Sequence, residues 1–453
     1  MTAERGWRSG FDRRDLLRGA GLAGLAGIGA AAVSGCGSPV ATGVAGTGPP
    51  KDSLTYWNLF SGGDGVRMVA MEDAYTKSHR DVSLNSVTLS WGNPYYTKLA
   101  LATLSSRPPD IGISHISRLP TLARAGLLSP IDESALAAHG MTADKFTAKA
   151  WETGHIDGKL YCVPLDTHVH CLYYRTDVCK KAGLLDSSGN LKPIKGPDEF
   201  IAALAAAKKV TKKYGGVVNI TADPSTCYRW FITLYSQLGG QVLADEGRTI
   251  VLDDDKAIKV LTFMQELTIK QKLMPNTVDG SAVQQMFSTG QVGFLIDGDW
   301  QVSTYQTAKV PFSMTLVPNI FGGPYSVFAD SHVFVLPKDP QRNHKRLGLT
   351  MDFIHTLETN AITWAMGGHI PAWLPVQHSK AYRELKPESN YASAAQAAVY
   401  DAPAWYSGAG SDYETVVGSA VASAETGQMT PRQAVATMRK GLQKYATTKP
   451  PVS

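Results

Sequence analysis

Tryptophans and tyrosines are plentiful in this chain, and their flat apolar faces suit the binding of sugar rings. Its 453 residues include nine tryptophans and 18 tyrosines, and an aromatic ring offers a broad apolar surface on which a pyranose can stack. Trp300 is the strongest candidate, because it follows the apolar strand 292–296 and Asp297-Gly298-Asp299 and should project at a sheet edge. Trp364 is expected to pack inside its helix. Three others lie at predicted strand or helix ends, where each could either line a ligand cleft or pack in the apolar core: Trp57, Trp91 and Trp230.

Polar side chains near these aromatic residues could hold sugar hydroxyl groups. Asp64, Asp166 and Asp330 follow predicted turns or chain crossovers, although aspartate is also common in turns for conformational reasons alone. In a cleft, a carboxylate can accept two hydroxyl hydrogens in charge-assisted bonds, and the amide of Asn58 can both donate and accept. We therefore count these four side chains as candidate ligand contacts.

Histidines gather at the predicted strand ends and crossovers. They are His115, His168, His170, His332 and His369. Imidazole is a common zinc ligand, so their convergence could form a metal site. The sequence shows no His-x-x-x-His helix and no carboxylate partner at ligand spacing. We therefore predict that His115, His168, His332 and His369 bind hydroxyls or line a cleft, with no metal and no cofactor.

The segment Gly158–Arg175, GKLYCVPLDTHVHCLYYR, must position several of these residues. A turn at Asp157-Gly158 leads into an apolar strand, and Pro164 breaks that strand's hydrogen-bond ladder because proline cannot donate. A polar interlude, 166–170, precedes a second strand, 171–174. This pattern suits a chain that crosses from one sheet to another, although a hairpin with a bulge is the alternative.

Strands and helices alternate through the first third of the chain after its N-terminal segment. The pattern predicts strands at 53–60, 82–89 and 111–115, helices at 66–78, 95–105 and 119–126, and a glycine-rich turn at 61–65. Such alternation favours an α/β domain with a mostly parallel sheet. Ligands of these sheets lie beyond the strand carboxyl ends, where Trp57-Asn58, Trp91 and His115 fall. Residues 429–446 predict a final helix with Thr430 as its N-cap.

Length and composition are those of an ordinary globular protein with room for two domains. Hydrophobic residues make up 43% of the chain and charged residues 18%. The formal net charge is +5, and residues 1–35 supply +2 of it through five arginines against three acidic residues. No basic stripe with interleaved aromatic residues carries the remaining charge, so we expect no nucleic-acid partner.

The N-terminus reads as an export signal. Residues 11–18, FDRRDLLR, precede an apolar run at 19–33 that is too short for a permanent membrane span and fits a signal-peptide core. The paired arginines resemble a twin-arginine signal, and Val33-Ser34-Gly35-Cys36 resembles a lipobox, whose cysteine is acylated. We predict a signal peptide over 1–35 and, over 36–52, an acylated Cys36 and flexible tether. A Sec signal cut elsewhere, or a slightly apolar disordered tail, is the alternative.

Four further cysteines could form disulfides if the chain is exported, because the count is even. Of the three possible pairings we prefer Cys162–Cys171 with Cys179–Cys227. Buried free thiols are the alternative.

Several motifs together resemble the extracellular solute-binding proteins of bacterial ABC importers, especially the maltodextrin and oligosaccharide binders. The first is Gly158-Lys159-Leu160-Tyr161-x-x-Pro164 followed by Tyr173-Tyr174. Others are Arg107-Pro108-Pro109-Asp110-Ile111, the Ala-Gly-Leu-Leu turn at 125–128, the Phe287–Phe294 element with Trp300, and the Gly-x-x-Pro turn at 368–371. The chain departs at 196–200, where Gly-Pro-Asp-Glu-Phe replaces the family's Thr-Trp-Glu-Glu-Phe. The correspondence covers nearly all of residues 53–445.

The resemblance implies a two-lobed α/β fold of the periplasmic-binding-protein type II, each lobe a mostly parallel sheet flanked by helices. Lobe 1 would comprise 53–163 plus 332–368, lobe 2 would comprise 169–327 plus 372–446, and 447–453 would be a disordered tail. Trp300 would stack on a sugar ring, and the loop with Asp299 would have a binding role.

The implied function is that of a monomeric, non-enzymatic lipoprotein on the outer face of the cytoplasmic membrane. It would bind a di- or oligosaccharide and deliver it to ABC permease subunits in the membrane. One alternative is an exported glycan-active enzyme, although no Gly-x-Ser-x-Gly or His-Glu-x-x-His motif is present. Another is a same-fold binder of a non-sugar solute such as a glycerophosphodiester, for which Arg229 is the obvious cleft arginine.

Overall fold

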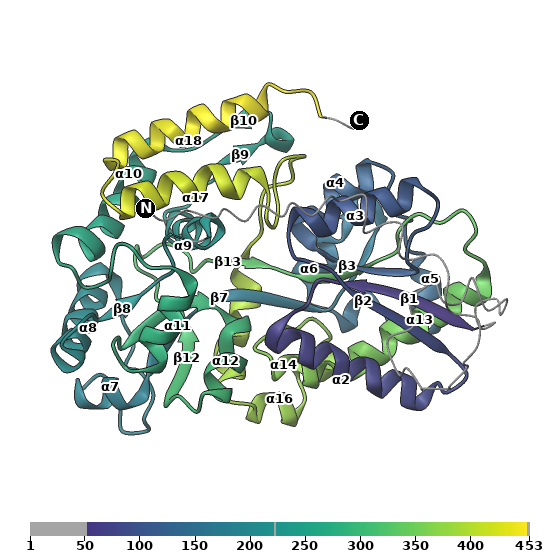
Figure 1. Cartoon of the computed structure of the whole chain (residues 1–453), viewed down its shortest axis with the longest axis horizontal. Coiled ribbons are helices and arrows are strands. Elements are labelled where there is room, and N and C mark those ends of the chain that lie inside the picture. The colour runs from purple at the N-terminus through teal and green to yellow at the C-terminus, as the bar shows by residue number, and fades with distance from the viewer. Residues whose placement is uncertain (1–51, 222, 451–453) are drawn as a thin grey trace, which may run out of the picture. The chain divides into compact units, whose positions relative to one another are not determined.

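The computed structural model of the chain describes residues 52–221 and 223–450 (Figure 1). The predicted signal peptide, Cys36, nearly all of the tether and the last three residues of the predicted tail lie outside these described residues. No helix in the described part of the chain is both long enough and apolar enough to cross a bilayer.

Five strands form the sheet of what we call the first lobe, in the order β2-β1-β3-β14-β6. β1, β2 and β3 pair in parallel, as the strand–helix alternation predicts, while β14 is antiparallel to both β3 and β6. Because β14 comes from a segment more than 200 residues after β3, the chain returns to this sheet late in its course. The strands are β1 (Ser53–Asn58), β2 (Ser83–Thr88), β3 (Ile111–His115), β6 (Cys162–Pro164) and β14 (His332–Val335).

Helices with buried apolar faces cover this sheet. Tyr56 of β1 packs against Phe353 with ring centres 5.1 Å apart, and Tyr75 packs on the same Phe353 at 5.0 Å. These contacts tie a helix near the start of the lobe to one far along the chain. The helices are α2 (Gly62–Ser78), α3 (Asn93–Leu104), α4 (Leu119–Arg124), α5 (Glu133–Ala138), α6 (Ala148–Thr153), α13 (His344–Thr359) and α14 (Ala361–Ala365).

A seven-stranded sheet organised on one long strand, β7, forms what we call the second lobe. β7 pairs antiparallel with β11, β12, β13 and β15, whereas only β11–β8 and β13–β16 are parallel. The expected predominance of parallel strands therefore holds for β1–β3 but not for this sheet. The strands are β7 (Asp166–Arg175), β8 (Gly216–Val217), β11 (Phe294–Gly298), β12 (Phe312–Leu316), β13 (Val327–Asp330), β15 (Ile370–Pro371) and β16 (Ala398–Val399).

The helices of the second lobe include the last two of the chain, which lie side by side in yellow in Figure 1. The final helix begins at the predicted N-cap, where the hydroxyl of Thr430 accepts from the N–H of Gln433 and the Gln433 side chain accepts from the N–H of Thr430. Such a reciprocal cap satisfies two otherwise orphaned donors. The helices are α7 (Thr176–Lys181), α8 (Gly196–Thr211), α9 (Pro224–Gln237), α10 (Asp254–Gln265), α11 (Gly280–Ser288), α12 (Val302–Thr307), α16 (Lys380–Glu384), α17 (Asp412–Glu425) and α18 (Pro431–Ala446).

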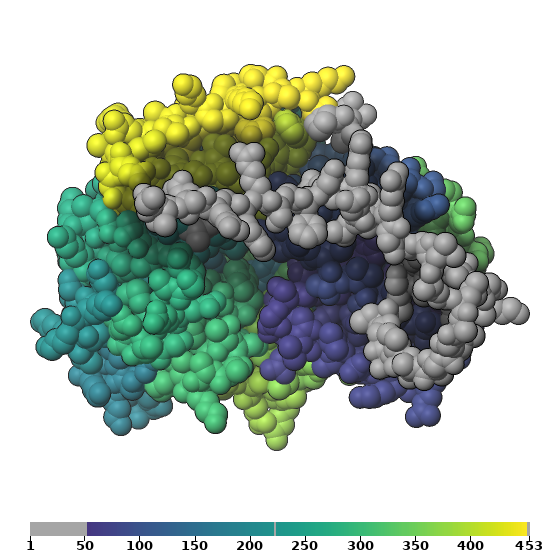
Figure 2. Space-filling view, in the orientation of Figure 1, coloured from purple at the N-terminus to yellow at the C-terminus, as the bar shows by residue number. Residues whose placement is uncertain are grey.

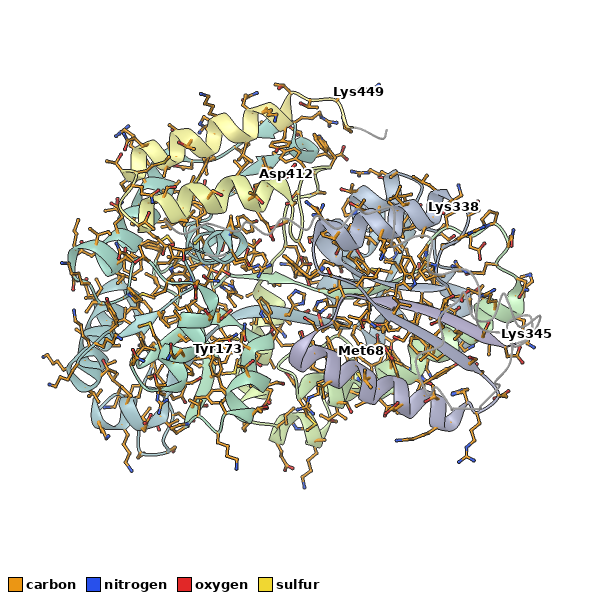
Figure 3. The ribbon with its side chains drawn as sticks, in the orientation of Figure 1. Met68, Tyr173, Lys338, Lys345, Asp412 and Lys449 are labelled. Carbon is orange, nitrogen blue, oxygen red and sulfur yellow. The ribbon has the colours of Figure 1, made fainter. Side chains whose placement is uncertain are left out.

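Each lobe has its own apolar core. Met68 of α2 belongs to the first core and Tyr173 of β7 to the second, and both are labelled in Figure 3. In the space-filling view, the purple residues of the first lobe and the green residues of the second form separate surfaces that meet near the middle of the face shown (Figure 2).

The chain crosses between the two sheets at Leu165 and again at Ser331, and the two crossovers hydrogen-bond to each other. The N–H of Leu165 donates to the carbonyl of His332 at 2.9 Å, and the Ser331 hydroxyl donates to the carbonyl of Asp166. Pro164 does end its strand, as predicted. The segment 166–170, however, is the first half of β7 and not a polar interlude, because antiparallel partners in β13, β15 and β11 satisfy its backbone.

The four cysteines of the described chain are free and buried, so the predicted disulfides are wrong. Cys162 lies in the first core, whereas Cys171, Cys179 and Cys227 lie in the second. The thiol of Cys227 donates instead to the carbonyl of Ile220 at 3.3 Å. Burial alone raises the pKa of the Cys162 thiol above its usual range, as expected of an unreactive core cysteine.

Candidate ligand-binding cleft

A cavity of about 440 Å³ lies where the two lobes face each other, and residues of both lobes line it. The first lobe contributes the turn after β1 and the first turn of α2, together with Trp91 and two strand ends. Gly63 lets α2 approach the second lobe, since a Cβ atom there would lie 2.7 Å from Cβ of Ser303. The lining residues are Leu59, Phe60, Ser61, Gly62, Gly63, Asp64, Trp91, His115, His168, Asp223, Arg229, Gln284, Trp300, Gln301, Thr304 and His332.

An arginine held among aromatic rings forms one side of the cavity. The guanidinium carbon of Arg229, on α9, lies 5.3 Å from the ring centre of Trp300 and 5.9 Å from that of Trp91. It also lies 5.5 Å from the ring centre of Phe328. Cation–π attraction at these distances holds the aromatic faces and the charge together. The cavity thus combines broad apolar surfaces with a cation.

Three histidines form the base of the cavity, and each has one ring nitrogen engaged by the protein. Nδ1 of His115 lies 2.8 Å from the Tyr96 hydroxyl, while Nδ1 of His168 and of His332 lie 3.1 and 2.7 Å from carboxylate oxygens of Asp166. The rings are packed together, with centres 4.2 Å apart for His168 and His332 and 4.8 Å for His115 and His332. The tethered nitrogens fix the ring orientations.

Burial keeps two of these imidazoles neutral. Burial, together with the neighbouring His332, lowers the pKa of His168 to about 3 even though Asp166 acts in the opposite sense. The pKa of His115 is also well below its usual value, chiefly through burial. The contact between His168 and Asp166 is therefore a hydrogen bond between a neutral ring and a carboxylate at neutral pH, and not an ion pair.

Asp166 is the centre of this arrangement although it does not line the cavity. Its fully buried carboxylate accepts from the indole N–H of Trp364 at 2.7 Å and from the backbone N–H of His332 at 2.9 Å, in addition to the two histidine contacts. Burial alone would raise its pKa, but the surrounding histidines hold the pKa well below the ordinary range. The expectation that no carboxylate partners the histidines is therefore wrong.

His369 is a buried cation between two carboxylates. Its Nε2 lies 3.1 Å from Asp64 and its Nδ1 lies 3.4 Å from Asp166, and its ring stacks on Trp364 at 4.3 Å. Burial alone would lower the pKa of His369, but Asp64 and Asp166 outweigh it and raise the pKa to about 9. Trp364 is buried, as predicted. Its ring stacks on His369 and its indole N–H donates to Asp166, so it contacts both members of the His369–Asp166 pair.

The structure brings six of the predicted ligand residues to the cavity and places two more directly behind it. Asp166 and His369 are the two behind. The six that line the cavity are Asp64, Trp91, His115, His168, Trp300 and His332.

The other five predicted contacts lie elsewhere. Trp230 is next to Arg229 on α9, and since successive helical residues are about 100° apart, it points into the second core and is 1% exposed. Trp57 packs against the first core. Asp330 accepts from the N–H and hydroxyl of Ser117, and Asp299 accepts from the N–H of Val169 at 3.0 Å.

Asn58, the fifth, is a buried structural residue. Its side-chain oxygen accepts from the N–H of Phe60 at 3.2 Å and from the hydroxyl of Thr88 at 3.0 Å. These bonds shape the turn between β1 and α2. The bond to Phe60 is local and the bond to Thr88 links β1 to β2, so both serve the fold whether or not a ligand is near.

Glu72, below Asn58, predicts a pH dependence of stability. The Ser86 hydroxyl donates to Glu72 at 2.9 Å, and burial raises the pKa of Glu72 from 4.5 to about 7. Because the folded state holds this proton more tightly, the stabilisation is present below the unfolded pKa and is lost as pH rises through about 7.

Glu72→Gln removes this titration but keeps an acceptor for Ser86. Between about pH 5 and about pH 8, we expect the native chain to lose about 2–2.5 kcal/mol relative to this variant. Urea unfolding measures both; parallel pH curves would contradict the expectation.

Several cavity residues were missed by sequence reasoning, notably Gln284, Gln301 and Thr304. Gln301 and Thr304 follow Trp300 directly, so their proximity to a predicted ligand residue was an available signal. Nothing local marks Gln284 on α11 or Asp223 at the start of α9, because their position depends on how the helices pack on the second sheet.

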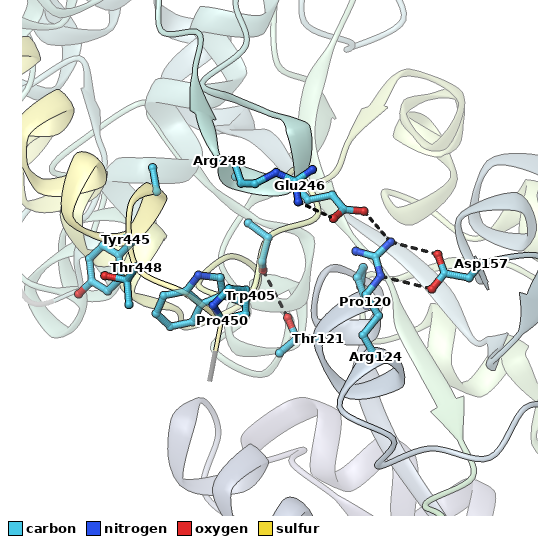
Figure 4. Close-up of a pocket in the computed structure, with 13 residues that line it drawn as sticks. Pro120, Thr121, Arg124, Asp157, Glu246, Arg248, Trp405, Tyr445, Thr448 and Pro450 are labelled. Carbon is cyan, nitrogen blue, oxygen red and sulfur yellow. Dashed lines mark hydrogen bonds and ion pairs between the residues drawn. The ribbon is translucent and has the colours of Figure 1, made fainter. Parts of the chain in front are cut away.

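A second cavity, of about 450 Å³, lies away from the cleft (Figure 4). Its charged groups satisfy one another: Arg124 pairs with Glu246 at 2.9 Å and with Asp157 at 3.3 Å. Arg248 also pairs with Glu246 at 3.5 Å. Because these charges already have partners, the cleft and not this cavity is the candidate ligand site.

Comparison with known proteins agrees with this geometry. The family model described as "Bacterial extracellular solute-binding protein" matches residues 60–361. The arabinooligosaccharide-binding protein of Bacillus subtilis (strain 168) is 26% identical over 271 residues, covering 59% of this chain and 57% of that protein. A maltooligosaccharide ABC transporter solute-binding lipoprotein of Streptococcus pneumoniae (strain ATCC BAA-255 / R6) is 25% identical over 297 residues, covering 63% and 65%. The chain thus aligns with less than two thirds of each relative's length.

The fold is shared over nearly the whole described chain. The GacH receptor of Streptomyces glaucescens GLA.O, solved unliganded and with acarbose, superposes with a TM-score of 0.72 at 18% identity, covering 87% of this chain and 99% of that one. The architecture is the two-lobed, type II binding-protein fold.

Proposed function

Because the chain belongs to the bacterial extracellular solute-binding protein family, we propose that it captures a di- or oligosaccharide between its lobes and delivers it to the permease of an ABC importer. The observation that carries this proposal is the cleft itself. Two tryptophan faces, neutral histidines and the side-chain amides of Gln284 and Gln301 meet in one cavity. Apolar surface for a sugar face, with polar groups for its edge, is the composition expected of such a site.

Both lobes contribute ligand contacts, which supports a closing mechanism. Trp91 and His115 come from the first lobe, and Arg229 and Trp300 from the second. A ligand that touches both favours the closed state, because only a difference in affinity between two states can shift their populations. Closure would rotate the lobes about the crossovers at Leu165 and Ser331, and the permease subunits would recognise the closed form.

Binding without catalysis is the better interpretation of the carboxylates in the cavity. Asp64 is paired with His369, and Asp223 accepts from the N–H of Ser225 at the start of α9. Both carboxylates thus have positions fixed by structural partners. The names of the curated relatives, which bind arabino- and maltooligosaccharides, support a sugar as the ligand.

A second candidate ligand is an anionic solute such as a glycerophosphodiester, and Arg229 favours it. Nε of Arg229 is buried without a hydrogen-bond partner among the described residues. A guanidinium in a cleft can bind phosphate or carboxylate oxygens. The sugar remains our main proposal because the aromatic faces and amides outnumber this one cation.

Tryptophan fluorescence of the purified chain, titrated with a panel of ligands, tests the proposal. The panel contains mono- and oligosaccharides, glycerophosphodiesters and polyamines, and each ligand is recovered and analysed afterwards. Saturable quenching by an oligosaccharide that is recovered unchanged supports the proposal. A response to phosphodiesters alone would replace it with the second candidate, and conversion of the sugar would replace it with an enzyme.

We further propose the domain layout that the sequence suggests: signal peptide 1–35, acylated Cys36 and tether to 52, lobe 1 from 53–163 plus 332–368, and lobe 2 from 169–327 plus 372–446. The tail would be 447–453 and the protein a monomer. The motif Val33-Ser34-Gly35-Cys36 and the naming of a curated relative as a lipoprotein support the anchor.

Replacing the anchor cysteine is expected to release the protein. Cys36→Ala cannot be acylated, and without a lipid chain only weak contacts would hold the chain at the membrane. Fractionation of cells that express the native chain and the variant measures the effect. A variant that stays in the membrane fraction would show that lipid on Cys36 is not the anchor.

A further inference from the structure

We infer that Asp166, His168, His332 and His369 form a binding site for a divalent metal ion of the zinc type, directly behind the cleft. One potential ligand atom from each of these four buried residues lies within 4.8 Å of all the others. Three imidazoles and a carboxylate are a donor set that suits zinc. Neither the family nor the proposed sugar function requires this site.

The distances from the Asp166 carboxylate to the three imidazoles are close to those of a tetrahedral site. Bonds of about 2.0–2.1 Å to nitrogen and oxygen place neighbouring ligand atoms about 3.3 Å apart. The distances from Asp166 oxygens to Nδ1 of His332, His168 and His369 are 2.7, 3.1 and 3.4 Å. All four donor atoms lie within 4.8 Å of one another, so an ion would draw the rings together by at most about 1.5 Å to reach the tetrahedral spacing.

The backbone already holds the four residues together. Asp166 and His168 are on β7, His332 begins β14, and His369 directly precedes β15, which pairs with β7 at Thr167 and Asp166. The N–H of His332 also donates to the Asp166 carboxylate. A site built on paired strands binds an ion with little loss of conformational freedom.

Groups around the four residues would orient them as ligands. The indole of Trp364 donates to Asp166, and Nε2 of His369 contacts Asp64. A histidine whose second nitrogen meets a carboxylate is typical of metal sites. Nδ1 of His369 is buried and has no hydrogen-bond partner among the described residues, so an ion that replaces its proton breaks no hydrogen bond of the protein.

Carboxylates in contact with the histidines also favour a cation. Asp166, whose pKa is held well below the ordinary range, contacts His168 and His332, and Asp64 contacts His369. Two further carboxyl groups, those of Asp299 and Glu358, are fully buried, and burial raises the pKa of each well above its usual value. A divalent ion would offset the cost of keeping the charge of Asp166 out of water. Because the metal and protons compete for the same nitrogens, binding would release protons.

The location gives the ion a specific role. β7 and β14 follow the two crossovers, so an ion bound by both strands would tie the lobes at the point about which they would rotate. His168 and His332 also line the cleft, and coordination would fix the rings that a ligand meets. Metal binding would thus stiffen the crossover and orient part of the cleft.

Metal binding by the purified full chain tests the inference. The chain is first freed of metal with a chelator, then titrated with zinc sulfate in competition with a chromophoric chelator. Cobalt(II) is added in a parallel titration, because its absorption reports four-coordinate nitrogen and oxygen ligation. We expect one zinc ion per chain and the strong visible absorption of a tetrahedral cobalt site.

Two variants and a matched control make the result specific. His332→Asn keeps an N–H donor near the position of Nδ1 but removes the imidazole ligand, and His168→Asn does the same on β7. Each is expected to weaken zinc binding by at least about tenfold. His139→Asn is the control, because His139 also contacts a carboxylate, Asp352 at 3.2 Å, but lies at the surface. Its zinc affinity should match that of the native chain.

Clear outcomes would overturn the inference. Zinc affinity that is equal in the native chain, His332→Asn and His168→Asn would show that the four residues are a hydrogen-bond network only. An octahedral cobalt spectrum would show that they do not form the tetrahedral site. Circular dichroism of the metal-free variants checks their folding; if His332→Asn is unfolded, His168→Asn and the native cobalt spectrum decide. Sugar titrations with and without zinc are read separately, so failure of the metal site is distinguishable from failure of the proposed function.

Discussion

Asp166→Asn lowers the free energy of unfolding by about 3–5 kcal/mol, the largest stability effect that we expect from a single substitution in the cleft region. The carboxylate accepts from Trp364, from two groups of His332 and from His168. Asparagine has the same size but replaces one acceptor oxygen with an NH₂ group, which would face donors. A buried donor without an acceptor costs its full desolvation penalty. Urea unfolding with a chelator present measures the hydrogen-bond network without any metal contribution.

The control for this variant is Asp157→Asn. Asp157 also pairs with a cation, Arg124, but its side chain is 70% exposed, and its positive φ of 51° is one that asparagine adopts readily. We expect a change within about 1 kcal/mol. If the two variants were equally stable, the network around Asp166 would contribute little, and the crossover would be held by backbone pairing alone.

Trp300→Ala weakens binding of the responding oligosaccharide by about 100-fold, or about 2–3 kcal/mol. The indole lines the cavity beside Arg229, with His168 5.6 Å away between ring centres. Truncation removes the apolar face and also the ring that holds the guanidinium in place. Calorimetric titration with the sugar identified in the fluorescence panel measures the loss.

Trp405→Ala controls for loss of an indole as such. Trp405 packs against Tyr406 and Tyr445, at 5.5 and 5.8 Å between ring centres, and lines the second cavity and not the cleft. Its removal should leave sugar affinity within about twofold of the native value. If Trp405→Ala lost affinity and Trp300→Ala did not, the ligand site would have to be moved to the second cavity.

Many elements were predictable because their signals are local. The strands at 53–58 and 111–115 and the helix from Pro431 to Ala446 follow from apolar periodicity and capping residues a few positions apart. The segment 61–65 shows the limit. Its glycines predict a turn, and Gly62 has a left-handed φ of 58°, yet α2 begins at this residue. Gly63 serves packing between the lobes, since a Cβ atom there would lie 2.7 Å from Cβ of Ser303.

The candidate site was predictable in its residue types but not in its connections. Trp91, Trp300 and the histidines were identified because aromatic and imidazole side chains at strand ends are chemically suited to ligands. Trp230 was misassigned because its neighbour Arg229, and not Trp230, faces the cleft, and helix rotation is set by packing on the second sheet.

The sequence by itself determined the α/β class, the family resemblance and the chemical character of the site, since these depend on residue types and short spacings. Only the tertiary structure decided that Asp166 meets His332, 166 positions later, and His369, far beyond it. The same holds for the four buried thiols, which are free: the fold places Cys162 in the first core, away from Cys171, and the other three cysteines lie unpaired in the second core. Contacts between distant segments depend on how whole sheets pair across the crossovers, and no local pattern in a single chain encodes that pairing.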